Sequence, residues 1–185
     1  NQRLITTVSA FDLELTNAPA TDPQHPGYSV LTAHQRVKGV ELEVQGRITP
    51  GWTVTAQASF QNPKVLSDTT AGANVGNRVA QAKRRTASLW TQYRLPQLPG
   101  LWVGGGLVNQ GDQFTANDNK WRLPGYTVLD LAAGYQFAGG ARLQVNLKNA
   151  GNRRYYLDGT ATAAGFGSVI PGEPRALRVA LDYSF

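Results

Sequence analysis

The chain has 185 residues, 18 basic and 12 acidic side chains, a formal net charge of +6 and a hydrophobic fraction of 41%. The length corresponds to one ordinary domain, and the hydrophobic fraction is too high for a disordered chain. No segment approaches the roughly 18 consecutive apolar residues of a membrane-spanning helix. Cysteine is absent and only two histidines occur, which excludes disulfides and thiolate ligands and predicts no metal site and no cofactor. Because the sequence starts at Asn1 and contains neither Met nor a signal sequence, we interpret it as a mature piece or an internal fragment.

Two-residue alternation of apolar and polar side chains is the dominant pattern along the chain. It is clearest at the C-terminus, where one face carries Leu177, Val179, Leu181, Tyr183 and Phe185. The other face of the same segment carries small, polar and charged side chains. Such a period of two predicts β-strands that have one apolar and one polar face.

The alternation predicts eight strands, over residues 4–16, 31–48, 52–62, 84–95, 101–110, 125–137, 142–156 and 175–185. Most of them are far longer than the usual globular strand of about 5 to 6 residues. They suit tilted strands that cross a bilayer, which need about 9 to 11 residues. Strand length therefore favours an all-β, antiparallel transmembrane barrel.

The predicted connections alternate between short and long. Residues 49–51, 96–100 and 138–140 have tight-turn composition, whereas residues 17–30, 63–83, 111–124 and 157–174 form long polar segments. Outer-membrane barrels have short periplasmic turns and long external loops. A soluble β-sandwich would also alternate, but it would not explain this asymmetry.

Aromatic residues gather near the short-turn ends, as expected for an interfacial girdle. They are Trp52, Tyr93, Trp102, Tyr135, Phe137, Tyr183 and Phe185, of which Trp102 falls on the polar-facing parity. The charged residues of the polar parity are predicted to face the lumen. They include Asp12, Glu14, Glu41, Glu43, Arg47, Arg94, Asp130, Arg142, Lys148, Arg178 and Asp182.

Several motifs occur in a specific order along nearly all of the chain. They are Arg36-Val-Lys-Gly-Val-Glu-Leu-Glu43, Thr49-Pro-Gly-Trp52, Ala87-Ser-Leu-Trp90, Leu123-Pro-Gly-Tyr-Thr-Val-Leu-Asp130, Val145-Asn-Leu-Lys-Asn149, Gly172-Glu-Pro-Arg175 and Tyr183-Ser-Phe185. In these motifs the chain resembles the C-terminal part of a TonB-dependent siderophore receptor of the outer membrane. One departure is Ala150-Gly151-Asn152 after Asn149, where the family usually has an acidic residue.

The resemblance implies a transporter of the bacterial outer membrane that takes up ferric siderophore in a TonB-dependent manner. In that family a 22-stranded barrel encloses an N-terminal plug, and a segment ahead of the plug contacts TonB. The chain would then be the last eight strands, with the plug and the TonB-contacting segment not present. Siderophore, vitamin B12, haem and nickel chelates use related barrels, so the ligand itself stays open. The alternative is a complete eight-stranded barrel with a structural or adhesin role.

The resemblance also suggests site residues. Ligand contacts would come from aromatic residues of the long loops, for which Tyr28, Trp121 and Phe166 are the candidates. The terminal alternation of Leu177, Val179, Leu181, Tyr183 and Phe185 resembles the signal that the barrel-assembly machinery recognises.

Two basic clusters stand at the long-loop ends of predicted strands, namely Lys83, Arg84 and Arg85, and Arg153 and Arg154. Under a barrel interpretation this end faces lipopolysaccharide, whose phosphates arginine and lysine bind. We therefore predict lipopolysaccharide contact and no nucleic acid as a partner. No catalytic motif is found, because neither nucleophile-elbow nor phosphate-loop spacing occurs, and the chain is not expected to be an enzyme.

Overall fold

The computed structural model describes residues 4–22, 24–25, 27–69, 72–161 and 167–183. Twelve strands occur in this part of the chain, and no helix long and apolar enough to cross a membrane is found in it. The strands are β1 (Leu4–Thr21), β2 (Ser29–Thr49), β3 (Trp52–Ser67), β4 (Arg85–Arg94), β5 (Leu101–Gln110), β6 (Gln113–Phe114), β7 (Arg122–Leu123), β8 (Tyr126–Gln136), β9 (Ala141–Lys148), β10 (Tyr156–Ala161), β11 (Gly167–Pro171) and β12 (Ala176–Tyr183).

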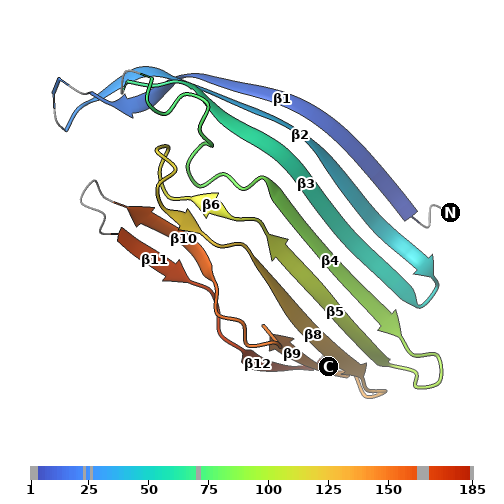
Figure 1. Ribbon diagram of the computed structural model, residues 1–185. Coiled ribbons are helices and arrows are strands. Elements are labelled where there is room, and N and C mark those ends of the chain that lie inside the picture. The colour runs from blue at the N-terminus through green and yellow to red at the C-terminus, as the bar shows by residue number, and fades with distance from the viewer. Residues whose placement is uncertain (1–3, 23, 26, 70–71, 162–166, 184–185) are drawn as a thin grey trace.

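Eight of these strands form one antiparallel sheet in the order β1-β2-β3-β4-β5-β8-β9-β12. The sheet is strongly curved, and β1 begins and β12 ends at its short-turn end (Figure 1). The other four strands form two hairpins, β6–β7 and β10–β11, inside the predicted long connections. The predicted all-β antiparallel fold is confirmed, and the sheet contains the eight predicted strands.

Some strand boundaries differ from the prediction. Strands β1 and β2 continue as a ladder to Thr21 and Ser29, after two register shifts, between Leu15 and Ala18 and between Ala18 and Pro19. Asn17 has a φ of +55°, a value that asparagine tolerates better than most residues, so the alternation is interrupted while the pairing resumes. At the other end of the chain, β9 ends at Lys148 because Asn149 and Asn152 have φ values of +45° and +48°.

The ladders place the apolar side chains on one face of the sheet. Leu89 lies opposite Leu107, which lies opposite Leu129 in the next ladder. These side chains remain exposed in the chain, and Leu177 at the sheet edge is 66% exposed. An apolar face without a protein partner, made of strands this long, suits contact with lipid.

The opposite face is polar and hollowed. Side chains that β4, β5, β8 and β9 contribute to this face line one cavity of about 830 Å³. In a closed barrel this face lines the lumen. The fold therefore gives the chain a lipid face and a lumen face.

The two faces exchange polarity toward the long-loop end of β1–β3. Asp12 lies opposite Lys38, one step along the same face beyond Ala10 opposite Val40. Asp12 and Glu14 are therefore on the apolar face, and the prediction that they face the lumen is wrong. The reason is that these strands continue beyond the apolar band into water, where the outward side can carry charge.

The lumen face becomes apolar where the outward face becomes charged. Val65 on that face is 1% exposed, and its backbone is bonded on both sides by the following loop, to Asn77 O at 2.9 Å and from Gly76 N at 2.9 Å. Leu13 and Val37 lie opposite each other on the same face. The loop after β3 thus covers the inner side at Val65, whereas Leu13 on the same face is 61% exposed.

Two tryptophans of the lumen face lie flat on glycine. A Cβ atom at Gly106 would lie 2.5 Å from Cε3 of Trp90, and one at Gly134 would lie 2.4 Å from Nε1 of Trp102. The glycines of β5, for which close strand approach or bending was predicted, therefore also leave room for indole rings. Trp102 is on the lumen face, as its parity predicts, whereas Trp52 and Tyr93 form a pair on the apolar face.

Candidate functional site

The lumen wall carries a small polar hollow at the middle of β1–β3. It has a volume of about 280 Å³ and is lined by Glu41 and Glu43 together with hydroxyl and amide side chains. Both glutamates are exposed, and neither forms an ion pair in the described part of the chain. Two carboxylates without an ion-pair partner on a lumen wall can accept hydrogen bonds from cationic groups.

The end of β9 is fixed by a polar cluster. Asp130 accepts a hydrogen bond from the Asn149 backbone N at 2.8 Å and forms an ion pair with Lys148. The Asn149 side chain, which is 2% exposed, donates to Arg153 O at 2.8 Å and to Glu173 O at 3.0 Å. Asn149, directly before the segment that departs from the family pattern, therefore anchors the connection between β9 and β12.

An arginine-centred network joins two of the long loops. Arg78 is 6% exposed, and its Nη2 donates to Asp112 Oδ2 at 2.6 Å. Arg122 donates to the same oxygen at 2.9 Å, and the Arg78 guanidinium lies 4.4 Å from the centroid of the Phe114 ring. The loop after β3 is thereby bound to the β6–β7 hairpin through one carboxylate.

A second set of contacts adds the third long loop. Gln113 is 3% exposed, and its side-chain amide donates to Leu157 O and to Asp158 Oδ1, at 3.4 and 3.1 Å. Gln81 donates to the other oxygen of Asp158 at 3.3 Å. Residues of the connections after β3, β5 and β9 thus form one interlocked loop unit.

The charge of Asp112 is stabilised within this unit. Burial alone would raise the pKa of this carboxyl, but the hydrogen bond and charge of Arg78, with the charge of Arg122, lower the pKa below its ordinary value. The ionised carboxylate therefore stabilises the folded loops above its ordinary pKa. This contribution is lost as the pH falls through the lowered value.

The predicted ligand residues lie on separate loops. Tyr28 is 72% exposed at the tip of the β1–β2 hairpin, with its ring 6.5 Å from that of His25. Trp121 is 51% exposed, next to β7 in the interlocked loop unit. Phe166 lies outside the described residues. No group of three or more potential metal ligands is found in the described ranges.

The structure brings together two of the five predicted lipopolysaccharide residues. Arg85 and Arg153 line one groove of about 200 Å³ at the long-loop ends of β4, β5 and β8, and Arg122 lines it as well. Lys83, Arg84 and Arg154 are not among the lining residues. Arg122 was missed by sequence reasoning because it is isolated in the sequence, and its neighbours are contributed by the fold.

The predicted assembly residues lie on the exposed edge strand. Leu177, Val179, Leu181 and Tyr183 share the apolar face of β12, which pairs only with β9 in the described sheet. Phe185 lies outside the described residues. The arrangement leaves one edge of β12 open for another strand.

Comparison with known proteins gives the family. The family described as "TonB dependent receptor-like, beta-barrel" matches residues 1–150. The metal-pseudopaline receptor CntO of Pseudomonas aeruginosa is 30% identical over 186 residues, which cover 99% of this chain and 25% of that protein. The ferrichrome receptor FcuA of Yersinia enterocolitica is 28% identical over 190 residues, covering 100% of this chain and 24% of that receptor.

Solved structures agree on the fold. The siderophore receptor PiuA from Acinetobacter baumannii superposes with a TM-score of 0.84 at 24% identity, covering 97% of this chain and 26% of that one. The chain therefore belongs to the TonB-dependent receptor β-barrel family, whose members are receptors and transporters of the outer membrane of Gram-negative bacteria. The predicted family and localisation are confirmed. The chain spans about a quarter of the length of the curated relatives it matches.

Mutation of Arg78 tests whether its contact with Asp112 holds the loops together. Replacing this arginine (Arg78→Leu) leaves the buried side of Asp112 without its partner, which costs about 2 kcal/mol locally. Hydrogen exchange of residues 112–123 in the full receptor should then become roughly thirtyfold faster. The exposed Arg84→Leu variant is the control and should leave exchange unchanged. Equal protection in Arg78→Leu and the wild type would show that the network does not hold the loops.

Proposed function

We propose that this chain is part of a TonB-dependent outer-membrane receptor that takes up a ferric siderophore. The family match over residues 1–150 is the observation that carries the proposal. It is supported by proteins named as a ferrichrome receptor, a siderophore receptor and a metal-pseudopaline receptor. The proposed role is binding and transport of the ligand without chemistry on it, in line with relatives named as receptors and transporters.

The chain supplies the last eight strands of a 22-stranded barrel, and the plug and TonB-contacting segment belong to other parts of the protein. Strands β1 and β12 are the two ends of the described sheet and do not pair with each other. In lipid each unpaired backbone group costs several kcal/mol, so both edges need neighbouring strands. This argues against a complete eight-stranded barrel with a structural or adhesin role.

We assign ligand recognition to exposed aromatic residues of the long loops. The exposed Tyr28 and Trp121 rings offer stacking surfaces to an apolar or catecholate ligand, and Phe166 completes the proposed set. The first two residues belong to different loop units. A ligand that contacts both would therefore bridge the β1–β2 hairpin and the interlocked loops.

Phosphate groups of lipopolysaccharide are proposed to bind the groove formed by Arg85, Arg122 and Arg153. Asn109 and Thr127 also line the groove and stand one step beyond Leu107 and Leu129 on the lipid face. The groove therefore lies directly above the apolar band. The Asp112 carboxylate, which pairs with Arg122, lines the groove too. Lys83, Arg84 and Arg154 contribute more diffuse positive charge.

The barrel-assembly machinery is proposed to recognise the terminal alternation of β12. An open edge that carries a regular row of apolar side chains can be extended by a partner strand. Leu177, Val179, Leu181, Tyr183 and Phe185 form that row.

Deleting the gene should abolish growth on one ferric siderophore of a panel, because a single receptor supplies each high-affinity route. In the restored receptor, Tyr28→Ala and Trp121→Ala should each weaken binding by about 1 kcal/mol, the usual worth of an aromatic stacking contact. Equilibrium binding of the radiolabelled ferric complex measures this. Uptake of every tested complex by the deletion strain would refute the substrate assignment.

Removing the groove charges (Arg85→Gln with Arg122→Gln and Arg153→Gln) should lower the amount of co-purified lipopolysaccharide, since each basic residue near an anionic surface is worth about 1 kcal/mol. Mass spectrometry of the purified receptor measures the bound lipid. A variant with Lys83, Arg84 and Arg154 changed to Gln carries the same charge loss and should show a smaller effect. Equal losses in both variants would contradict a specific groove.

The assembly proposal is tested by Leu181→Asp, which should reduce the folded, heat-modifiable receptor in the outer membrane. Leu143→Asp is the matched control, because Leu143 lies opposite Leu181 in the β9–β12 ladder on the same lipid face. A recognition signal predicts a much larger defect for Leu181→Asp. Identical defects would indicate lipid packing alone.

A further inference from the structure

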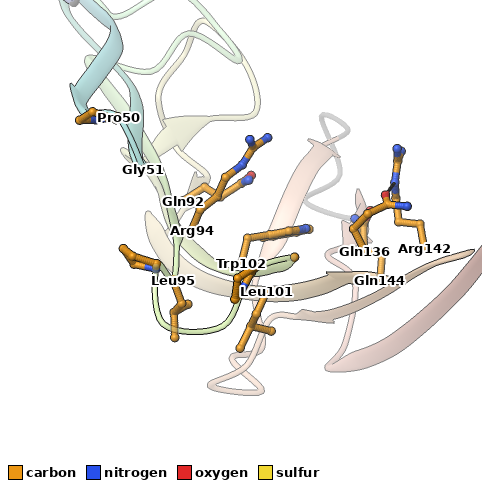
Figure 2. Close-up of a pocket in the computed structure, with 13 residues that line it drawn as sticks. Pro50, Gly51, Gln92, Arg94, Leu95, Leu101, Trp102, Gln136, Arg142 and Gln144 are labelled. Atoms are coloured by element: carbon orange, nitrogen blue, oxygen red, sulfur yellow. Dashed lines mark hydrogen bonds between the residues drawn. The ribbon is translucent and has the colours of Figure 1, made fainter. Parts of the chain in front are cut away.

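A trough rich in arginine lies on the lumen face at the short-turn end of the sheet. The cavity of about 830 Å³ is lined by Arg94 and Arg142, and a smaller hollow beside it is lined by Arg47 and again by Arg94. Figure 2 shows Arg94 and Arg142 rising on either side of Trp102. The sequence does not indicate this arrangement, because the three arginines belong to the separate strands β2, β4 and β9.

The positive charge of the trough is not compensated by neighbouring groups. Among the described residues that line the two hollows, none is acidic. In the described ranges Arg47, Arg94 and Arg142 make no ion pair, and the Arg142 Nε donates to the neutral Gln136 Oε1, at 3.1 Å. Asp182 lies opposite Arg142 in the β9–β12 ladder without forming an ion pair with it.

Other cations of the lumen face have carboxylate partners. Lys148 forms an ion pair with Asp130, and Arg178 forms one with Glu173. A cation that already binds a carboxylate has few donors left for a ligand, whereas the trough arginines keep most of theirs available. The trough therefore offers free guanidinium groups to an incoming anion.

The lumen wall also changes the sign of its charge along strand β2. Glu41 and Glu43 lie in the middle of the lumen face, and Arg47, which has the same parity, lies at the short-turn end. The long loops, to which we assign ligand recognition, are at the opposite end of the sheet (Figure 1). An anion that crosses the lumen from the loops therefore meets the arginines last, and the charge of the wall attracts it toward this end.

The floor and the size of the trough suit a small aromatic or chelating ligand. The Trp102 indole lies flat on Gly134 and forms a stacking surface between the arginines. The amide side chains of Gln92 and Gln144 stand beside the arginines (Figure 2), where they can donate further hydrogen bonds. The volume lies within the range of about 300–1,000 Å³ that is usual for small-molecule sites. The trough is open on one side, so a bound complex can leave it.

We propose that the trough is a second binding subsite for the ferric siderophore, near the exit of the lumen, and that it selects complexes with a net negative charge. This inference deepens the proposed function and rests on it. Arg94 and Arg142 bind carboxylate or catecholate oxygens of the passing complex through paired hydrogen bonds, with Arg47 adding charge at the rim. Trp102 stacks on an aromatic or apolar part of the same complex.

The test uses the full-length receptor in cells that lack other iron receptors, with a panel of radiolabelled ferric complexes. The panel includes ferric citrate and a ferric tris-catecholate, which carry negative charge, and ferrichrome, whose hydroxamates cancel the charge of the ferric ion. The wild-type receptor should import an anionic complex. Its uptake rate should fall at least about tenfold in Arg94→Gln with Arg142→Gln, because a hydrogen bond to a charged group contributes about tenfold or more. Binding of the complex to de-energised cells should stay the same, since the loops bind it there.

Two matched variants serve as controls. Arg94→Lys with Arg142→Lys keeps the charge and should restore part of the uptake rate. Lys64→Gln with Arg175→Gln removes two exposed cations at the long-loop end and should import the complex at the wild-type rate. A heat-modifiable band on an unheated gel shows that each variant is folded. Equal uptake by the wild type and by Arg94→Gln with Arg142→Gln would overturn the proposal, and so would import confined to uncharged complexes.

A photocrosslink tests directly whether the complex occupies the trough. Thr53 lines the smaller hollow together with Arg94 and is replaced by the photoreactive residue p-benzoylphenylalanine. Irradiation during uptake should attach the carbon-labelled siderophore to the receptor, and Arg94→Gln with Arg142→Gln should lower the yield at least about tenfold. Absence of label from the receptor of importing cells would overturn the subsite and leave the proposed function intact. If the wild-type receptor imported no ferric complex, the proposed function would itself fail, and the subsite with it.

Discussion

Backbone hydrogen bonding in a medium without water is the constraint from which the rest of the structure follows. In hydrocarbon, a strand is tolerated only when each of its N–H and C=O groups has a partner on a neighbouring strand. In the sheet from β1 to β12 every strand has a paired neighbour on both sides except the two outer strands, β1 and β12. Once the backbone is paired, the side chains are free to divide between two environments. The alternation of apolar and polar residues along each strand results from this division.

The same constraint explains where the pattern changes. Beyond Ala10 and Val40 the outward face meets water and polar headgroups, and it carries an ion-pair cluster in which Arg36 Nε lies 2.7 Å from Asp12 Oδ1. Part of the inner face of this region, at Val65, is covered by the loop that bonds to it. A reversal of polarity within one strand therefore marks the boundary of the membrane and does not indicate a change of register.

Much of the fold could be predicted because its signals are local. Alternation and turn residues identify the eight strands of the sheet and the class of barrel without any tertiary information. The outer extension of β1 and β2 could not be predicted, since Asn17 interrupts the alternation while the pairing continues on either side. The Arg78–Asp112 pair spans 34 positions and the Gln81–Asp158 contact spans 77. Neither leaves a sequence pattern, because each depends on where the loops meet in space.

The loops form two parts that are held differently, namely the β1–β2 hairpin and the interlocked loop unit. This difference determines which part can move when a ligand binds. Hydrogen bonds of residues 22–28, in the described part of the chain, stay within the β1–β2 hairpin, as between Asp22 N and Tyr28 O. The loops after β3, β5 and β9 are instead joined through Asp112 and Asp158. A unit held by buried charged hydrogen bonds opens rarely, whereas an isolated hairpin moves at little cost. A ligand that contacts both parts would shift the hairpin relative to a fixed platform, so loop motion on binding is expected on the β1–β2 side.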